Sequence, residues 1–312
     1  MITLTDIEAA HDRIRPHIHR TAVLTNRTIN TLARADLHFK CENFQKIGAF
    51  KARGGLNAVL QLTAEQLKNG VTTHSSGNHA QAIAYAARQV GTRAYIVMPR
   101  TAPQVKKDAV RGYGAEVIEC EPTLDAREEG VRKIMERTGA ELVHPFDDDR
   151  VIAGQATAAK ELLEDAGPFD VLLAPVGGGG LLSGTALAVH YLSPQTRVVA
   201  GEPEGAADAV LSFRSGKVEK APFVNTIADG LLTTLSDRTL AIIREHVADI
   251  LTVSDPEIVA AMRLIWERMK IVIEPSCAVP LAAVLKHKDH FAGQRLGLIL
   301  TGGNVDLGKL PF

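Results

Sequence analysis

The chain has 312 residues, of which 46% are hydrophobic and 23% are charged. This composition is typical of a globular protein and excludes intrinsic disorder, and the length predicts about two domains of roughly 150 residues each. The formal net charge of -1 leaves no basic surplus with which to bind nucleic acid or an anionic membrane.

The chain lacks the sequence signals of secretion and of membrane insertion. No apolar run approaches the roughly 18 residues of a membrane span, and the N-terminal residues lack the basic and apolar regions of a signal peptide. Cys41, Cys120 and Cys277 are odd in number and far apart, which favours free thiols in a reducing compartment. We therefore expect a cytoplasmic protein that binds neither nucleic acid nor a membrane.

Short apolar runs alternate with amphipathic stretches along the chain. A capping box formed by Thr5 and Glu8 predicts the first helix. Apolar runs predict strands over Leu37–Cys41, Ala94–Met98, Glu116–Cys120, Val171–Val176, Val198–Ala200 and Leu296–Leu300. Amphipathic patterns predict helices over 81–89, Ala102–Tyr113, 181–192 and a late segment that opens at Ser254. The alternation indicates an α/β fold with covered parallel sheets, in which ligands bind beyond the carboxyl ends of the strands.

Four consecutive glycines follow one predicted strand and precede a predicted helix. They are Gly177, Gly178, Gly179 and Gly180. Without side chains, the backbone N–H groups can approach an anion closely, and the helix N-terminus adds a favourable dipole. The segment has neither the Lys-Ser/Thr of a P-loop nor the spacing of a dinucleotide site, so a single phosphate fits best. The alternative is a tight turn, which needs only one or two glycines.

Lys51 lies in the segment Gly48–Gly55, beside Phe50 and among small residues. A partly desolvated lysine has a lowered pKa, and its neutral amine can form a Schiff base with a carbonyl cofactor. Taken alone, a lysine in such a segment is more often a solvated surface residue than a catalytic one.

Two further polar segments, His74–Ala80 and Thr301–Asn304, also stand at the ends of predicted elements. Helix capping and ordinary turns are the alternatives to ligand binding there.

Taken together, four motifs resemble the fold-type II pyridoxal-phosphate enzymes. The motifs are FKARG, SSGNHA, PVGGGGLLSG and TGGNVDL, in this order. The resemblance covers essentially the whole chain and is greatest to the branch of serine racemase, serine/threonine dehydratase and 3-hydroxyaspartate dehydratase, above all the last. It implies two open twisted α/β domains with pyridoxal 5'-phosphate in the cleft between them. The large domain would comprise residues 1–69 and 148–312, and a small, mobile, substrate-binding domain residues 70–147.

The resemblance also implies roles for residues around the cofactor. Lys51 would carry the cofactor as a Schiff base, Phe50 would lie beside its ring, and Asn78 would bond the 3'-oxygen. Thr301 would face the ring nitrogen, where many relatives have Ser. A neutral hydroxyl can only hydrogen-bond that nitrogen, which favours elimination over transamination. The phosphate would be held by Gly177, Gly178, Gly179, Gly180 and Leu181.

Further residues are implied to bind the substrate or a metal. The substrate group is Ser75, Ser76, Gly77, His79, Arg127 and Thr233, and Ser76 matches the second acid/base of the racemases. Arg127 would hold a second carboxylate, unless it is an ordinary surface charge among acidic neighbours. The metal group is Glu202, Ala206 and Asp208, whose oxygens suit Mg²⁺, or Ca²⁺ or Mn²⁺, unless this is only an acidic loop.

The implied reaction is β-elimination from a 3-hydroxy amino acid, which yields a 2-oxo acid and ammonia. The stretches VMPRTAPQVKKD, HPFDDDRVIAGQ and IVIEPSCAVPLA favour 3-hydroxyaspartate, with serine and threonine as weaker substrates. The rivals are a serine or aspartate racemase and a threonine/serine ammonia-lyase proper. GAFKARG and SSGNHA count against a β-replacement enzyme, and Lys51 counts against a module that has lost activity. A homodimer is also expected.

Overall fold

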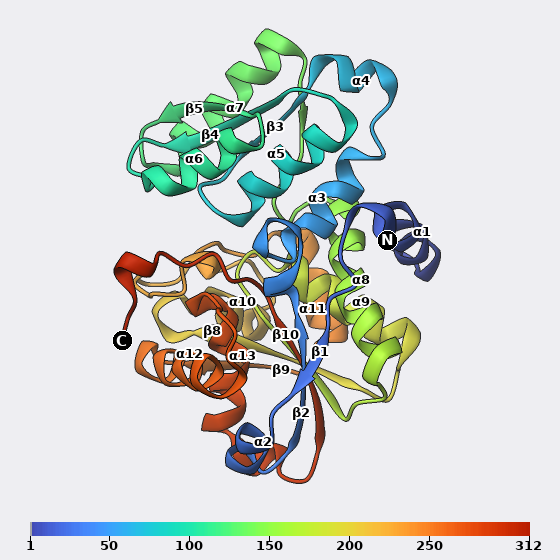
Figure 1. The fold of residues 1–312 in the computed structure, drawn as a ribbon, viewed down its shortest axis with the longest axis vertical. Helices are drawn as coiled ribbons and strands as arrows, with labels where there is room; N and C mark the ends of the chain where they lie inside the picture. Colours follow the sequence, from blue (N-terminus) through green and yellow to red (C-terminus); the bar gives the residue numbers. More distant parts are fainter. Residues whose placement is uncertain (1) are drawn as a thin grey trace.

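The computed structural model describes residues 2–312, which form two separate β-sheets. The larger sheet has six strands in the order β1-β2-β10-β7-β8-β9, parallel except for β1. The smaller sheet has four parallel strands in the order β5-β4-β3-β6. Figure 1 shows the smaller sheet above the larger one, with helix α3 (Lys51–Val59) between them.

The strand bounds show which segments build each sheet. The larger sheet contains β1 (Val23–Thr25), β2 (Asp36–Cys41), β7 (Val171–Pro175), β8 (Arg197–Pro203), β9 (Asp249–Val253) and β10 (Arg295–Leu300). The smaller sheet contains β3 (Val71–His74), β4 (Ala94–Pro99), β5 (Glu116–Cys120) and β6 (Glu141–Leu142). All six predicted strands are therefore present, and their ends differ from the predicted ones by at most three residues.

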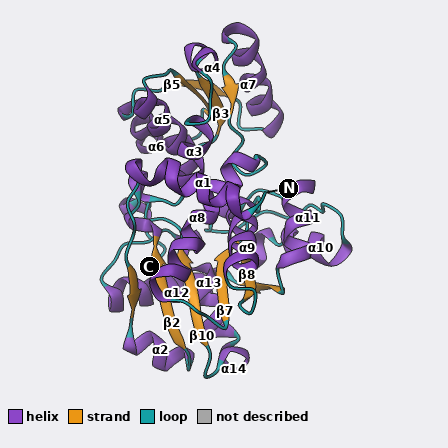
Figure 2. Cartoon of the chain, turned by 90° about the vertical axis from the view of Figure 1, so that its right-hand side faces the viewer, coloured by secondary structure: helices purple, strands orange, loops and turns teal. Residues whose placement is uncertain are grey.

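Helices cover both faces of the larger sheet, as Figure 2 shows. Along β7, Leu172 and Ala174 face one hydrophobic cluster, whereas Val171 and Leu173 face another. The first cluster is completed by α1 (Leu4–Ile14), α8 (Asp149–Ala166), α9 (Gly180–Leu192), α10 (Asp208–Ser215) and α11 (Asp237–His246). The second is completed by α2 (Arg27–Ala33), α12 (Asp255–Met269), α13 (Pro275–Lys286) and α14 (Lys288–Phe291). Burial on both faces explains why the strand reads as a continuous apolar run.

The smaller sheet is likewise covered on both sides. Along β4, Ile96 and Met98 pack towards α3, α5 (Asn78–Val90) and α6 (Gln104–Gly112). Tyr95 and Val97 pack on the other side, towards α7 (Leu124–Thr138). A short helix, α4 (Ala64–Asn69), leads into β3.

The first helix begins earlier than the sequence analysis predicted. Its N-cap is Thr3, whose capping box is completed by Asp6, so that Thr5 lies inside the helix. Ile2 precedes the cap, and Ile7 lies in the same buried cluster, so the pair forms a hydrophobic staple that fixes this register. The late helix has its cap where predicted, at Ser254, with Glu257 completing the box.

Helix α3 packs against helices of both parts of the molecule through its glycines. A Cβ on Gly54 would lie 2.7 Å from the Val151 carbonyl oxygen of α8, and one on Gly55 would lie 3.1 Å from the Ala82 Cβ of α5. The absence of side chains at these two positions therefore lets three helices approach closely. Because Lys51 is the first residue of α3, this packing fixes it at the junction of the two sheets.

Within residues 2–312, no helix combines the length and the apolar character needed to cross a membrane. The three cysteines are free, with Cys41 and Cys277 buried and Cys120 half-buried. Burial raises the pKa of the Cys41 thiol to about 12 and raises that of Cys277 as well. Both thiols therefore remain protonated and pack as small apolar side chains.

Candidate active site

Residues before Lys51 are tied to the carboxyl end of the central strand β10. The Phe50 N–H donates to the Thr301 carbonyl oxygen at 3.0 Å, and Ala49 forms an antiparallel bridge with Gly302. Ligands of open α/β sheets bind beyond these carboxyl ends. The sequence motifs that contain Lys51 and Thr301 are thus brought together although they lie at opposite ends of the chain.

Lys51 is half-buried, and its amine has one polar partner among residues 2–312. Its Nζ donates to the Pro145 carbonyl oxygen at 2.7 Å and lies 5.3 Å from the centre of the Phe50 ring. Burial lowers the pKa of Lys51 to about 8, because the protein cannot solvate the ammonium as water does. A substantial fraction of the amine is therefore neutral near pH 8, as a nucleophile or a base requires.

The glycine loop joins β7 to α9 as the sequence predicted. Gly179 has a φ of +87° and is the N-cap of α9, which no side chain caps within the described part of the chain. The N–H groups of the first turn, including those of Gly180 and Leu181, are consequently available to an anion. Packing also requires glycine in this loop, because a Cβ on Gly178 would lie 2.2 Å from Cδ1 of Phe146.

Asn78 begins α5 and lies in a network that crosses from the smaller sheet to the larger. Its amide nitrogen donates to Glu274 at 2.9 Å, and its amide oxygen accepts from Asn304 at 2.8 Å. Burial raises the pKa of Glu274 to about 7, and the neighbouring Asp229 carboxylate adds to this effect. Asn78, the residue expected at the 3'-oxygen, is therefore positioned by two other site residues.

The Thr301 hydroxyl is buried, with the residue 3% exposed, and has no hydrogen-bond partner among residues 2–312. An unsatisfied buried hydroxyl is costly and uncommon in folded proteins. It therefore indicates that a polar atom of a bound group completes this position.

The serine-rich turn lies between β3 and α5. The Ser75 hydroxyl accepts from the Gly77 N–H at 3.2 Å, whereas the Ser76 hydroxyl makes no hydrogen bond within the described residues. The N-cap of α5 is Gly77, and no side chain of the described residues caps this helix. Free backbone N–H groups at this turn are suited to a carboxylate.

The ring of His79 is buried and neutral, so it offers no positive charge to a substrate carboxylate. Its Nε2 donates to the Val143 carbonyl oxygen at 3.0 Å, while its buried Nδ1 has no partner among residues 2–312. Burial, followed by the charge of Lys51, lowers the pKa of His79 well below its usual range. The ring is thus neutral, and Nδ1 is an acceptor. A substrate carboxylate could be bound only through the backbone of this residue.

Arg127 and Thr233 lie at the edge of this arrangement. Arg127 is half-buried in the first turn of α7, and its Nε donates to the Thr123 carbonyl oxygen at 3.2 Å. Its charge adds to burial in lowering the pKa of His74, at the end of β3, so the guanidinium lies near the serine-rich turn. It has no ion-pair partner in the described residues. Thr233 is exposed in the loop before α11, and its side chain makes no hydrogen bond to another residue in the described part of the chain.

Two buried carboxylates form a separate site beside β8. Glu202 is 1% exposed and accepts from the N–H groups of Ala209 at 2.6 Å and Val210 at 3.0 Å, so it caps α10. Asp208 is 2% exposed, and its Oδ2 has no partner among the described residues. Burial raises the pKa of Glu202 to about 8, with repulsion from Asp208 adding to it, and burial raises that of Asp208 to about 6.

The segment His144–Asp149, which from the sequence is either a solvated loop or a source of hinge or metal-binding groups, lies beside Lys51 and the glycine loop. Pro145 supplies the carbonyl that holds Lys51, Phe146 packs on the glycine loop, and Asp147 accepts from Ser236 at 3.1 Å. The run HPFDDD between two predicted elements was the available signal, but nothing in it indicates which distant residues it contacts.

Comparison with known proteins places the chain among characterised enzymes. The sequence pattern described as pyridoxal-phosphate dependent enzyme matches residues 14–302. The chain is 54% identical over 310 residues to beta-hydroxyaspartate dehydratase from Paracoccus denitrificans, covering 99% of this chain and 98% of the relative. It is 47% identical over 308 residues to L-threo-3-hydroxyaspartate ammonia-lyase from Saccharomyces cerevisiae, covering 98% and 94%.

A solved structure shows the same architecture over the whole chain. The crystal structure of serine racemase from Dictyostelium discoideum is 51% identical and superimposes with a TM-score of 0.94, covering 98% of this chain and 99% of that one. The chain therefore belongs to the family of pyridoxal-phosphate dependent enzymes, which confirms the fold class and the cofactor predicted from its sequence.

Proposed function

We propose that the protein removes water from a 3-hydroxy amino acid by β-elimination, with 3-hydroxyaspartate as the preferred substrate and a 2-oxo acid and ammonia as the final products. The observation that carries this proposal is the Lys51 amine with its lowered pKa, in a segment that is bound to the end of β10, where the buried side chain of Thr301 is a hydroxyl rather than a carboxylate. The two hydroxyaspartate enzymes described above support the choice of substrate.

The residues present fit pyridoxal phosphate. The unpartnered Thr301 hydroxyl suits a ring nitrogen, and the uncapped start of α9 suits a phosphate. Lys51 would hold the aldehyde carbon, Phe50 would lie beside the ring, and Asn78 would bond the 3'-oxygen. When bound, the cofactor supplies the electron sink that makes the Cα proton of an amino acid removable.

Lys51 has two proton-transfer tasks in this proposal. Once released by the incoming substrate, its neutral amine accepts the Cα proton, and the resulting ammonium can protonate the β-hydroxyl as the C–O bond breaks. Water leaves, and hydrolysis of the released imine gives the 2-oxo acid and ammonia. The Pro145 carbonyl, which accepts from Nζ at 2.7 Å, would orient the amine between the two transfers.

The experiment for this proposal compares 2-oxo acid release from the stereoisomers of 3-hydroxyaspartate, from L-serine, D-serine and L-threonine. The expected result is the highest kcat/KM for one hydroxyaspartate stereoisomer. Equal turnover of serine and hydroxyaspartate would remove the substrate preference. Absence of 2-oxo acid from every substrate by the cofactor-loaded protein would remove the elimination itself.

Arg127→Ala should act selectively on a dicarboxylate. Loss of a charge-assisted hydrogen bond of about 1.5–3 kcal/mol lowers kcat/KM for hydroxyaspartate by about 10- to 100-fold. The kcat/KM for serine, which has no second carboxylate, should change by less than about threefold. The matched control is Arg132→Ala on the same helix, where the arginine is exposed and pairs with Glu129. An equal loss on both substrates would contradict a role in binding the second carboxylate.

Serine racemisation is the second candidate function. It is favoured by the similarity to serine racemase and by the unpartnered Ser76 hydroxyl, which matches the racemase acid/base. Exchange of configuration needs a proton donor on the face of Cα opposite Lys51. A chiral assay separates the two reactions, since Ser76→Ala would abolish interconversion of L- and D-serine while 2-oxo acid release continued.

We further propose a divalent cation at Glu202, Ala206 and Asp208. Two buried carboxylates without a cation are unfavourable, and the unpartnered Asp208 Oδ2 offers a hard oxygen ligand. Within residues 2–312 no three His, Cys, Asp or Glu side chains gather into a metal site. The Ala206 carbonyl and water would therefore complete a shell suited to Mg²⁺, Ca²⁺ or Mn²⁺.

Asp208→Asn should abolish stabilisation by the cation. At a hundredfold excess over its Kd, Mg²⁺ should add about 2.7 kcal/mol to the free energy of unfolding of the unmodified protein and raise its Tm. Calorimetry in the presence of Mg²⁺ and in the presence of EDTA measures this difference in Tm. Glu204→Gln is the control, because this exposed neighbour pairs with Lys286 instead. A shift of the same size in Asp208→Asn, or none in the unmodified protein, would contradict the site.

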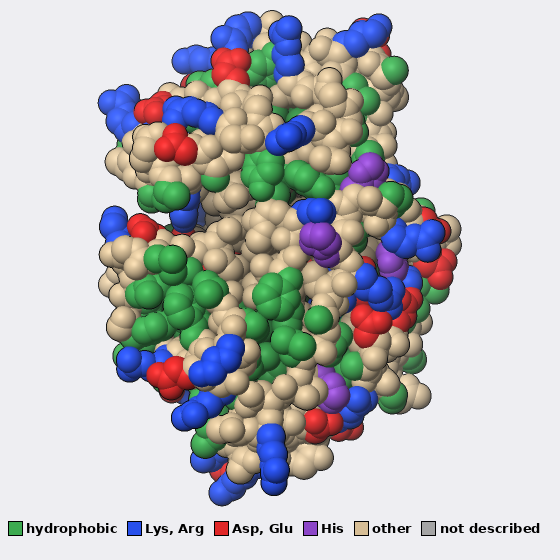
Figure 3. All heavy atoms as spheres, viewed as in Figure 1, with side chains coloured by type: hydrophobic (Ala, Val, Ile, Leu, Met, Phe, Trp, Pro, Cys, Tyr) green, Lys and Arg blue, Asp and Glu red, His purple; other side chains and the backbone are tan. Residues whose placement is uncertain are grey.

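The two sheets also support the predicted division into a large domain of residues 1–69 and 148–312 and a small domain of residues 70–147. We propose that the small domain closes over the substrate and excludes water. The contacts it would rearrange include the ion pair between Lys106 and Asp229, with 2.7 Å between Nζ and Oδ2. Figure 3 shows a hollow at one side of the molecule, between its upper and lower parts. That the protein is a homodimer stays a prediction, which light scattering can test.

A further inference from the structure

Four charged side chains are completely enclosed between α3, β2 and α8. Arg53, Lys40 and Glu42 are 0% exposed, and Glu161 is 1% exposed. We call these four residues the buried ion cluster. Its two cations and two carboxylates balance in charge. Removing ions from water is costly, however, so such a group persists only where the geometry is nearly ideal.

Arg53 has a partner for every hydrogen of its guanidinium. Nε and Nη2 donate to the two oxygens of Glu42 at 2.7 and 2.8 Å. Nη2 and Nη1 donate to the two oxygens of Glu161 at 2.7 and 2.9 Å, and Nη1 also donates to Thr157 at 3.1 Å. These five bonds use all five donors of a rigid, planar fork, which fixes the orientation of the side chain as well as its position.

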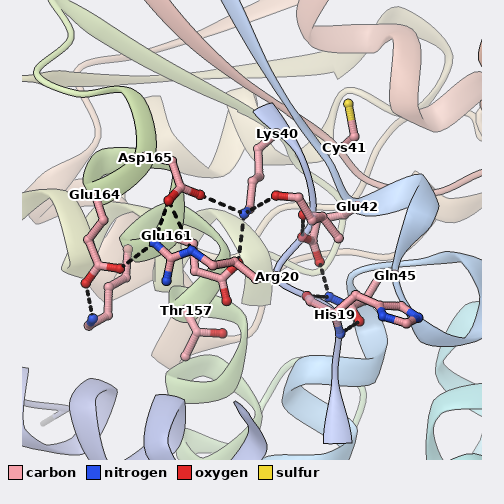
Figure 4. Close-up of polar contacts among 12 residues, drawn as sticks. His19, Arg20, Lys40, Cys41, Glu42, Gln45, Thr157, Glu161, Glu164 and Asp165 are labelled. Atoms are coloured by element: carbon pink, nitrogen blue, oxygen red, sulfur yellow. Dashed lines mark hydrogen bonds and ion pairs between the residues drawn. The ribbon is translucent and has the colours of Figure 1, made fainter. Parts of the chain in front are cut away.

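The partners of Arg53 are themselves held in place. Lys40 donates to Glu161 at 2.7 Å and to the Thr21 carbonyl oxygen at 2.8 Å, while the Thr21 hydroxyl donates to Glu42 at 2.6 Å. Figure 4 shows the Lys40 amine, near the end of β2, pointing to Glu161 and Asp165 of α8. The cluster is therefore anchored on the larger sheet and on the helix that covers it.

Arg53 lies two residues after Lys51 in the first turn of α3. On the other side of Lys51, the Phe50 N–H is bound to the Thr301 carbonyl oxygen and Ala49 is bridged to Gly302. The cofactor lysine is thus held from both sides by contacts to the larger sheet. In contrast, its own amine has, within residues 2–312, only the Pro145 carbonyl as a polar partner.

A stability role alone does not account for this cluster. Replacement of a buried ion pair by apolar residues of similar volume is often neutral or stabilising, so burying four charges is a poor way to strengthen a core. What a doubly bidentate arginine provides is orientation. We propose that Arg53 is a positioning residue, which fixes the first turn of α3 through Glu42 and Glu161 and thereby sets the location of the Lys51 amine. The inference deepens the proposed function, because it rests on Lys51 as the lysine that binds the cofactor.

The test compares Arg53→Lys, which keeps the charge but loses the planar fork, with Met262→Ala. Met262 is fully buried in α12, in the cluster on the other face of the larger sheet, and its truncation controls for lost stability. In the full chain without cofactor, mass spectrometry measures the acylation of Lys51 by an amine reagent as a function of pH. In the loaded enzyme, kcat and KM are measured by 2-oxo acid release.

The unmodified protein and Met262→Ala should both show an acylation midpoint near pH 8. In Arg53→Lys the loosened turn admits water to the amine, and the midpoint should rise by about one pH unit. Its kcat should fall by about tenfold or more, because small displacements of a reacting group are costly, while KM changes by less than about threefold. If Arg53→Lys does not fold, Glu161→Gln is used instead, because it keeps the shape of one of the two carboxylate partners of Arg53. It should also raise the acylation midpoint and lower kcat.

Equal midpoints and equal kcat in Arg53→Lys and Met262→Ala, at a similar loss of Tm, would overturn the positioning role and leave the proposed function intact. Conversely, a shifted midpoint in a protein whose unmodified form releases no 2-oxo acid would support the positioning of Lys51 and refute the proposed function.

Discussion

Lys51→Ala should abolish attachment of pyridoxal phosphate and lower kcat for 2-oxo acid release by about 1,000-fold or more. The substitution removes the covalent link to the cofactor and the base for the Cα proton, and general bases alone contribute about 100- to 10,000-fold. Visible absorbance of the loaded protein and a 2-oxo acid assay measure the two losses.

Lys46→Ala is the matched control for this substitution. Lys46 lies five positions earlier and is half-buried. Its backbone N–H donates to Gln45, but its amine makes no hydrogen bond or ion pair in the described chain. Its removal should leave both the absorbance and kcat within about twofold of the unmodified protein. A Lys51→Ala variant that retained the visible band, or turned over at the rate of Lys46→Ala, would contradict the assignment.

Gly178→Ala should weaken cofactor binding by about 10- to 100-fold, equivalent to the roughly 1–3 kcal/mol that overpacking costs. The new methyl group would lie 2.2 Å from Cδ1 and 2.4 Å from Cε1 of Phe146. Either the ring moves or the loop does, and both change the backbone N–H groups that face the phosphate. Titration of the cofactor-free protein with pyridoxal phosphate gives the Kd.

Gly112→Ala provides the comparison, because a Cβ at that position of α6 meets nothing within 4 Å. Alanine is the better helix former by up to about 1 kcal/mol, so this variant should be at least as stable as the unmodified protein and bind the cofactor equally well. Similar Kd values for Gly178→Ala and Gly112→Ala would show that the glycine loop does not bind the phosphate.

Most of the fold could be predicted because its central strands are buried on both faces. The buried strands β4 and β7 differ by one residue from the predicted Ala94–Met98 and Val171–Val176. Glu116–Cys120, the edge strand β5, also has the predicted bounds. The strand Val71–His74 was missed because two of its four residues are threonines, although Thr72 and Thr73 are both buried and Thr72 donates to the Tyr95 carbonyl oxygen at 2.9 Å. Hydrophobic periodicity cannot detect a strand whose polar side chains are buried.

The candidate site was predictable where its residues form local motifs and not where it depends on distant contacts. The segments around Lys51, Asn78 and the four glycines stand out in the sequence. The Pro145 carbonyl that holds the amine is 94 residues from Lys51, and Glu161 is 108 residues from Arg53. Such partners are set by the packing of helices across two sheets, which neither composition nor spacing reveals.

The most direct test of the account is to identify the lysine that binds the cofactor. The unmodified protein is loaded with pyridoxal phosphate, reduced with borohydride, digested and sequenced by mass spectrometry. One reduced adduct is expected, on the peptide that contains Lys51 and at that residue. An adduct on another lysine, or no adduct in a protein that releases 2-oxo acid, would contradict it.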